Sequence, residues 1–153
     1  MTADVEKTLL QIMLSEKDCD AVRFLWPANP MDENSQIKEY RWKRVVFGLT
    51  CSPFLLAATI KHHAEKFKWL FPEEVRILNS ELNVDDVISG ADCPIEARSI
   101  AVNLSKILEE AKLPLRRWVS NDKWLQQEFH LTSEPKNEAV ELCGADSKVL
   151  GLV

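Results

Sequence analysis

The chain has 153 residues, and hydrophobic residues make up 46% of them, which is enough to bury the core of one domain. Its 19 Lys and Arg residues are outnumbered by 24 Asp and Glu residues, and the resulting net charge of −5 argues against strong autonomous binding to duplex nucleic acid. Its four widely spaced cysteines show no zinc or disulfide pattern, and without a signal peptide or a long apolar run the chain is predicted to be intracellular, cytoplasmic or nuclear, with no membrane partner.

The predicted elements alternate between strands and helices along the chain. Short runs of β-branched and aromatic residues predict strands, and the stretch 27–35 between two of them has turn chemistry. Helices are predicted from Pro53 to about Leu70, before Pro72, and again after Pro94, where apolar residues recur with helical spacing. Strands are expected near residues 3–5, 9–13, 22–26, 39–47, 76–82, 87–91 and 115–119.

These elements predict an α+β fold in which two long helices pack on one face of a mainly antiparallel sheet and leave the other face open. Residues 1–121 are predicted to form this unit, and the polar, weakly patterned stretch 122–153 is predicted to begin a following segment. Four of the five tryptophans lie in strands or beside apolar residues, so core packing is predicted for them rather than base stacking on an open surface. The tryptophans are Trp26, Trp42, Trp69, Trp118 and Trp124.

Adjacent carboxylates between two apolar runs are the most informative feature of the chain. Asp85 and Asp86 lie between Ile77-Leu78 and Val87-Ile88, which predicts a tight β-hairpin with both acids at its tip. A third acid, Asp4, stands at the start of another predicted strand. Carboxylate oxygens are the ligands that Mg²⁺ prefers, and a pair of such cations serves nucleotidyl transfer. The alternative is that Asp85 and Asp86 form an ordinary solvated turn, in which Asp is common.

A strand, a turn and a helix are predicted in succession across residues 46–56. Gly48 marks the turn, Ser52 is a good N-cap, and Pro53 fits the first helical position. Gly48 would let a template base and a nucleotide approach the backbone closely, and the alternative is that it serves only the turn.

Taken in order, these motifs resemble those of reverse transcriptases, most closely the Pao/BEL group of long-terminal-repeat retrotransposons. The resemblance covers nearly the whole chain. The stretches that carry it are Asp4-Val5-Glu6-Lys7 with 10–12, Arg23-Phe24-Leu25-Trp26 with Tyr40-Arg41, Phe47-Gly48 with 52–58, Asn83-Val84-Asp85-Asp86 with 89–91, then 115–121 and 148–152.

The resemblance implies a polymerase palm with partial fingers in residues 1–121, followed from 122 by the start of a thumb or connection segment. It implies RNA-directed DNA polymerase chemistry with Mg²⁺ or Mn²⁺, acting on deoxynucleoside triphosphates and a primed RNA or DNA template, in a particle that holds other parts of a retrotransposon polyprotein. The residues that it assigns are Asp4, Asp85 and Asp86 for catalysis, these acids and the Val5 carbonyl for metal, Leu9, Gly48, Ser52, Pro53 and Asn83 for nucleotide and template, and Leu115, Arg116, Arg117 and Trp118 for primer.

Two positions depart from the family pattern. Asn83 stands where the family has an aromatic residue, usually Tyr, and Leu9 stands where Phe or Tyr lies beneath the incoming sugar and excludes a 2′-hydroxyl. Leu9 fills volume but cannot stack, so weakened nucleotide binding and poorer rejection of ribonucleotides are expected. The isolated chain is expected to be weakly active or inactive, and the alternative is a non-catalytic remnant or an interaction module on a palm scaffold.

Overall fold

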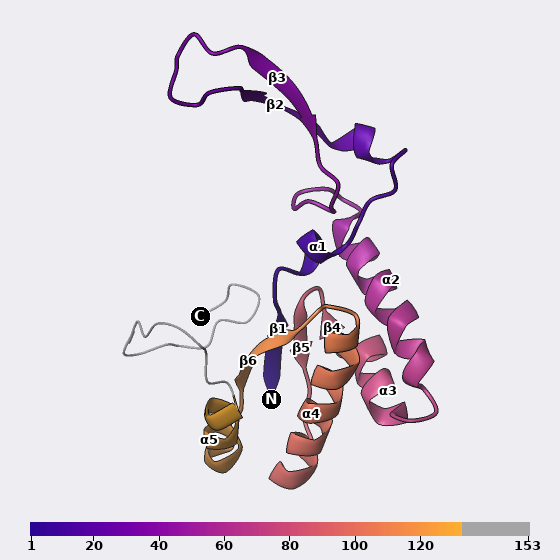
Figure 1. The fold of residues 1–153 in the computed structure, drawn as a ribbon. Helices are drawn as coiled ribbons and strands as arrows, with labels where there is room; N and C mark the ends of the chain where they lie inside the picture. The colour runs from indigo at the N-terminus through magenta and orange to yellow at the C-terminus, as the bar shows by residue number, and fades with distance from the viewer. Residues whose placement is uncertain (133–153) are drawn as a thin grey trace.

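The computed structural model of the protein describes residues 1–132, so the predicted stretch 148–152 lies outside the described residues. This part of the chain is α+β, with five α-helices and an antiparallel four-stranded sheet (Figure 1), which confirms the predicted class. The elements are β1 (Thr2–Val5), α1 (Thr8–Gln11), η1 (Cys19–Val22), β2 (Arg23–Pro27), β3 (Ile37–Arg41), α2 (Ser52–Ala64), η2 (Glu65–Phe67), α3 (Pro72–Ser80), β4 (Leu82–Asn83), β5 (Asp86–Ile88), α4 (Pro94–Glu110), β6 (Leu115–Val119) and α5 (Lys123–Thr132).

The four-stranded sheet has the order β4-β5-β1-β6, and each neighbouring pair is antiparallel. β1 is a central strand, and its side chains alternate between two faces. Ala3 and Val5 are buried, whereas Thr2 and Asp4 are half-buried on the opposite face. One face of the sheet is therefore apolar and the other carries Asp4.

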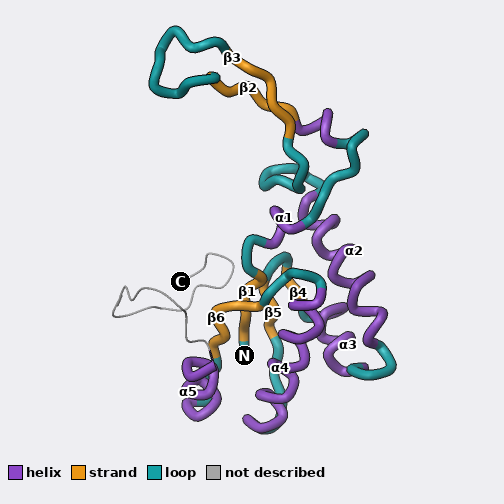
Figure 2. The backbone as a smooth tube through the Cα atoms, viewed as in Figure 1, coloured by secondary structure: helices purple, strands orange, loops and turns teal. Residues whose placement is uncertain are grey.

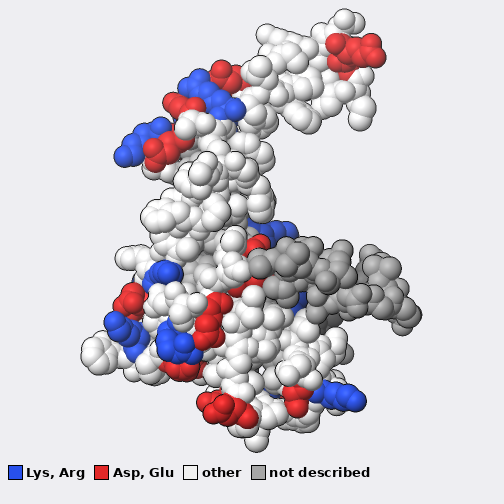
Figure 3. Space-filling view, turned by 180° about the vertical axis from the view of Figure 1, so that it is seen from behind, with Lys and Arg blue, Asp and Glu red and all other residues white. Residues whose placement is uncertain are grey.

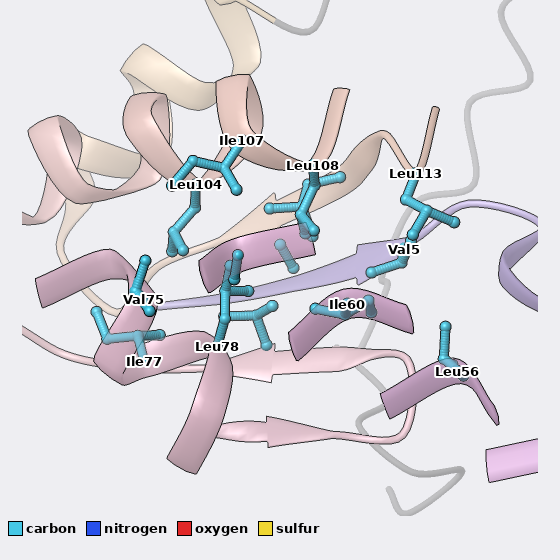
Figure 4. Packing of buried hydrophobic residues seen from close by; sticks show 14 of the residues in the cluster. Val5, Leu56, Ile60, Val75, Ile77, Leu78, Leu104, Ile107, Leu108 and Leu113 are labelled. Carbon is cyan, nitrogen blue, oxygen red and sulfur yellow. The ribbon is translucent and has the colours of Figure 1, made fainter. Parts of the chain in front are cut away.

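Helices α2, α3 and α4 pack on the apolar face (Figure 4). Together with Ala3, Val5 and Val87 of the sheet they enclose a single large core, and burying each large aliphatic side chain contributes about 2 kcal/mol. Polar contacts also join the helices, because His63 Nε2 lies 2.8 Å from the Ile107 carbonyl oxygen and the Asn103 amide donates to Glu74 Oε1 at 2.7 Å. The fully buried core residues of the three helices include Leu56, Ile60, Ile77, Leu78, Leu104, Ile107 and Leu108.

Strands β2 and β3 form a separate two-stranded sheet that projects from the rest of the molecule (Figure 2). At its base, an isolated bridge joins Met13 to Arg44, and the Val45 amide donates to the Ile12 carbonyl oxygen at 3.0 Å. We call residues 23–41, which comprise the two strands and their loop, the arm. All five residues of β3 are exposed, so the arm adds little to the core.

The strands predicted near 3–5, 22–26, 87–91 and 115–119 correspond to β1, β2, β5 and β6, and the helix predicted after Pro94 is α4. The helix predicted for 53–70 is shorter, since α2 ends at Ala64 and a 3₁₀ turn follows. The strand predicted for 39–47 is confined to β3, which ends at Arg41.

Two predicted strands are wrong, because a short apolar run has no period of its own that separates strand from helix. Residues 9–13 contain the end of the short helix α1, and residues 76–80 belong to α3. Pro72 at the start of α3, with Glu73 and Glu74 in its first turn, favours a helix, and its buried residues have helical spacing. The hairpin with the acids therefore begins at Leu82 and not at Ile77.

The prediction that most tryptophans pack in the core is also wrong. Trp26 and Trp42 lie exposed on or beside the arm, and Trp69 is 97% exposed. Among the tryptophans, all of which lie in the described part of the chain, only Trp118 packs against the clusters of buried residues.

Helix α5 packs against α4, because Leu125 and Phe129 form a second buried cluster with Ala97 and Ala101. The predicted boundary at residue 122 falls just before this helix, and of the segment predicted to follow it only residues 122–132 are described. No described helix has the length and apolar character needed to span a bilayer.

Candidate functional site

The β4–β5 hairpin carries two of the predicted acids. Asn83 pairs with Asp86, so Val84 and Asp85 form a two-residue loop. Val84 has a φ of 56°, in the left-handed region that such loops usually fill with glycine. A β-branched residue is strained there, so the tip of the hairpin keeps this shape against a local energetic cost.

Strand register places the third acid beside this hairpin. Asp4 of β1 lies opposite Asp86 of β5, and the Val5 amide donates a hydrogen bond to the Asp85 carbonyl oxygen at 2.9 Å. Three acids from two separate segments are therefore neighbours, and Asp4 and Asp86 share one face of the sheet.

Asp4 is the acid whose ionisation this arrangement changes most clearly. Partial burial raises the pKa of Asp4, the Arg117 guanidinium lowers it, and the negative charges of Asp85, Asp86 and Glu6 raise it further, with a net upward shift. Like charges directly opposite each other on neighbouring strands are also destabilising. The acids thus form a local concentration of negative charge that would be relieved by a cation.

A β-bulge in β6 directs two basic residues toward these acids. Thr2 and Asp4 are partners of Val119 and Arg116, so β6 holds one residue more than β1 between the paired positions. Arg117 occupies the bulge with a φ of 52°. Its Nη1 atom lies 3.8 Å from Asp4 Oδ2, and Arg116 Nε donates to Glu6 Oε2 at 3.1 Å. Both arginines are exposed, so these ion pairs are weak.

The four residues predicted to contact primer have different environments in the structure. Leu115 is buried in the main core, and Trp118 packs against Phe129 with ring centroids 5.3 Å apart and ring planes tilted by 31°. Leu115 and Trp118 are therefore held by internal packing. Arg116 and Arg117 reach the surface beside Asp4, so a primer contact from β6 would rest on the two arginines.

A pocket of about 300 Å³ adjoins the hairpin and brings together four of the five residues predicted to contact nucleotide and template. Leu9 forms part of its buried wall, and Asp85 closes one side, whereas Asn83 does not line it. Its lining residues are Thr8, Leu9, Phe47, Gly48, Leu49, Thr50, Ser52, Pro53, Leu56, Val84 and Asp85.

The turn that forms one wall of this pocket needs its glycine. Gly48 has a φ of 86°, and no atom lies within 4 Å of the place where a Cβ would stand. Ser52 is not the N-cap that the sequence predicts, because Cys51 holds that position and Ser52 begins the helix. Instead, the Ser52 hydroxyl donates to the Val46 carbonyl oxygen at 2.6 Å and ties the turn to α2.

Within residues 1–132, no group of three or more His, Cys, Asp or Glu side chains is arranged to hold a metal ion. The backbone thus makes Asp4, Asp85 and Asp86 neighbours, although their carboxylates do not form a ready-made cage. In chemical terms the donor set, three carboxylates and the Val5 carbonyl, fits Mg²⁺ or Mn²⁺, because these hard cations take oxygen ligands.

Two residues that shape the site, Val84 and Thr8, were not assigned these roles from the sequence. Val84 is strained, and the only signal was a β-branched residue inside a two-residue hairpin loop. Thr8 is buried and donates its hydroxyl hydrogen to the Val5 carbonyl oxygen at 2.6 Å, which competes for the oxygen that was predicted to bind metal.

In comparisons with known proteins, no protein-family model matches the chain and no curated protein matches it.

Proposed function

We propose that this chain is the palm segment of a reverse transcriptase related to the Pao/BEL group of retrotransposons. In this proposal Asp4, Asp85 and Asp86, with the Val5 carbonyl, bind Mg²⁺ or Mn²⁺, and the substrates are a primed RNA or DNA template and deoxynucleoside triphosphates. The observation that supports it best is the register of β1 and β5, in which Asp4 faces Asp86 and Asp85 borders the pocket.

The bound cations would lower the pKa of the primer 3′-hydroxyl and neutralise charge on the triphosphate. The chain's own residues supply the rest of the site. Asp4 and Asp86 hold negative charge together on the two central strands, and a bound cation would relieve the repulsion that, after partial burial, raises the pKa of Asp4. The pocket beside Asp85 offers an apolar wall for a nucleotide, with Leu9 filling the position of the family's aromatic residue.

Arg116 and Arg117 are suited to contact the phosphates of the primer, since both are exposed beside the acids. Arg117 has a second effect, because the same guanidinium lowers the pKa of Asp4. Arg117 therefore acts as a weak internal counterion at the proposed metal site.

The test is primer extension on an RNA template with Mg²⁺ and with Mn²⁺. We expect weak extension by the natural chain, none by Asp85→Asn, and stronger extension by the double variant Leu9→Phe with Asn83→Tyr. The ratio of ribonucleotide to deoxynucleotide incorporation should fall in the double variant, because an aromatic ring excludes the 2′-hydroxyl.

Binding of Mn²⁺, followed by electron paramagnetic resonance, separates the proposal from its alternative. A chain that binds Mn²⁺ through Asp4, Asp85 and Asp86 but does not extend primers keeps the metal site and lacks the rest of a polymerase. If Asp85→Asn binds Mn²⁺ as well as the natural chain and none of the proteins extends primers, the non-catalytic remnant or interaction module is correct.

A further inference from the structure

The arm has one face that is almost entirely aromatic. Phe24 pairs with Tyr40 and Trp26 pairs with Lys38, so these four side chains share one face, and Trp42 continues the same alternation beyond β3. The Trp42 amide donates to the Val22 carbonyl oxygen at 3.1 Å, which extends the ladder to this residue. We call this set the aromatic face.

The rings of the aromatic face are ordered against one another and open to solvent. Phe24 stacks on Tyr40 and on Trp42, with ring centroids 5.6 Å and 5.3 Å apart. Trp26, Tyr40 and Trp42 are 53%, 42% and 43% exposed. Figure 1 shows that the arm stands away from the sheet and from helices α2 to α5. A large aromatic surface is therefore exposed on a projecting hairpin, which is unusual unless a partner covers it.

The two faces of the arm differ in chemistry. On the opposite face, Arg23 and Arg41 bind the same carboxylate, with Asp20 Oδ1 at 3.0 Å from Arg23 Nη2 and 3.1 Å from Arg41 Nη1. Arg23 also pairs with Glu39, the only acid in either strand. Figure 3 shows charges of both signs side by side on the arm. The aromatic face, by contrast, carries Lys38 as its one charged strand residue.

We propose that the aromatic face binds single-stranded nucleic acid, with bases stacking on its rings and Lys38 contacting a phosphate. Every base has a π-face, so a row of exposed rings with an adjacent cation binds a strand without reading its sequence. Duplex bases are already stacked on each other and cannot reach the rings, which agrees with a net charge of −5 that disfavours duplex binding. This site goes beyond the proposed polymerase function and requires neither metal nor catalysis.

A protein partner is the less favoured occupant, because it would be expected to use the exposed aliphatic residues as well. Leu25 and Ile37 are exposed, yet both lie on the opposite face among the ion pairs. The separation of rings from aliphatic side chains therefore favours a ligand that recognises rings. The loop of the arm also contains the acidic residues Asp32 and Glu33. Because they would repel a nucleic acid, the proposed binding surface ends before this loop.

The test is fluorescence anisotropy of a labelled single-stranded oligothymidylate with the full chain in metal-free buffer. The double variant Trp26→Ala with Tyr40→Ala should bind at least roughly thirtyfold more weakly, because removing each stacked ring weakens binding by roughly fivefold or more. Leu25→Ala with Ile37→Ala is the matched control on the other face, and it should bind as the natural chain does. Lys38→Gln should reduce the slope of log K against log salt by about 0.7.

The residues substituted in both double variants lie outside the buried core. The thermal unfolding of both variants should therefore match that of the natural chain, and this measurement is the control for correct folding. Equal binding by the aromatic variant and the natural chain would overturn the proposal, as would equal affinity for duplex and single strand. Sedimentation could instead show that the natural chain is a dimer and that only the aromatic variant is a monomer, with oligothymidylate binding unchanged. That result would identify a second copy of the chain as the occupant and would also overturn the proposal. The polymerase proposal stands or falls separately, because this binding is measured without cations.

Discussion

The substitution Asp4→Asn removes one of two carboxylates that face each other across β1 and β5. Two like charges directly opposite each other on neighbouring strands destabilise the fold by about 0.2–1 kcal/mol. The substitution also removes the ion pair between Asp4 and Arg117, but this loss is small, because the Arg117 side chain is 84% exposed and its Nη1 atom is 3.8 Å from Asp4 Oδ2. In metal-free buffer at pH 7 the variant should therefore be more stable. For a chain of this length the gain corresponds to an increase in Tm of at most about 4 °C.

The dependence on pH follows from the raised pKa of Asp4. The folded protein holds this proton more tightly than the unfolded chain, so stability falls as the pH rises from the ordinary value of 3.8 through the higher folded pKa. Asp4→Asn should remove this part of the slope. A cation bound to the acids has the opposite effect and stabilises the folded protein. At a cation concentration ten times its Kd, the free energy of unfolding rises by about 1.4 kcal/mol in the natural chain and by less in the variant.

Thermal unfolding followed by far-UV circular dichroism, with EDTA or with Mg²⁺ at several pH values, measures both effects. Glu33→Gln is the control, because it removes an acid from the exposed loop of the arm. A lower Tm for Asp4→Asn in EDTA would refute the reasoning about repulsion. An equal rise in Tm with Mg²⁺ in the natural chain and in Asp4→Asn would refute the role of Asp4 in cation binding.

Three further outcomes follow from single contacts. Val84→Asn should raise the free energy of unfolding by about 1 kcal/mol, since Asn tolerates the left-handed region, and a loss of stability would show that Val84 is not strained. Leu104→Ala should cost about 3 kcal/mol in urea unfolding, whereas the exposed control Leu131→Ala should cost under about 0.5 kcal/mol, and similar costs would contradict the described core. Arg116→Ala should weaken binding to a primed template at low salt and lose this effect at high salt, whereas a salt-independent loss would argue against a phosphate contact.

Sequence patterns were sufficient where one period dominated. The helix predicted after Pro94 matches α4, because its helical spacing persists over the whole element. The predicted strand 115–119 also coincides with β6, although its residues do not alternate between apolar and polar. The adjacency of Asp4 to the hairpin acids was also anticipated, but only through the order of the motifs. Sheet register is a tertiary property, and nothing in the spacing of the acids specifies which strands become neighbours.

Sequence patterns failed where apolar residues did not imply burial. The arm and the residue after it carry Phe24, Trp26, Tyr40 and Trp42 at alternating positions, which is the pattern of a half-buried strand, yet no described element covers that face. The buried half of an alternating strand can be buried by a partner as well as by the chain itself. Alternation alone therefore predicts which residues share a face of the strand, but not which element or partner covers that face.

Backbone strain supplies an argument about the site that does not depend on the resemblance to polymerases. Of the four non-glycine residues with positive φ in the described chain, Lys7, Val84 and Arg117 lie within three residues of, or in ionic contact with, a site acid. Left-handed conformations of such residues cost about 1–2 kcal/mol each, so they persist only where the surrounding structure holds them. A turn with no role beyond connecting β4 to β5 would accept Gly or Asn without this cost. Backbone strain concentrated beside the acids therefore favours a functional role for Asp85 and Asp86 over the alternative that they form an ordinary solvated turn.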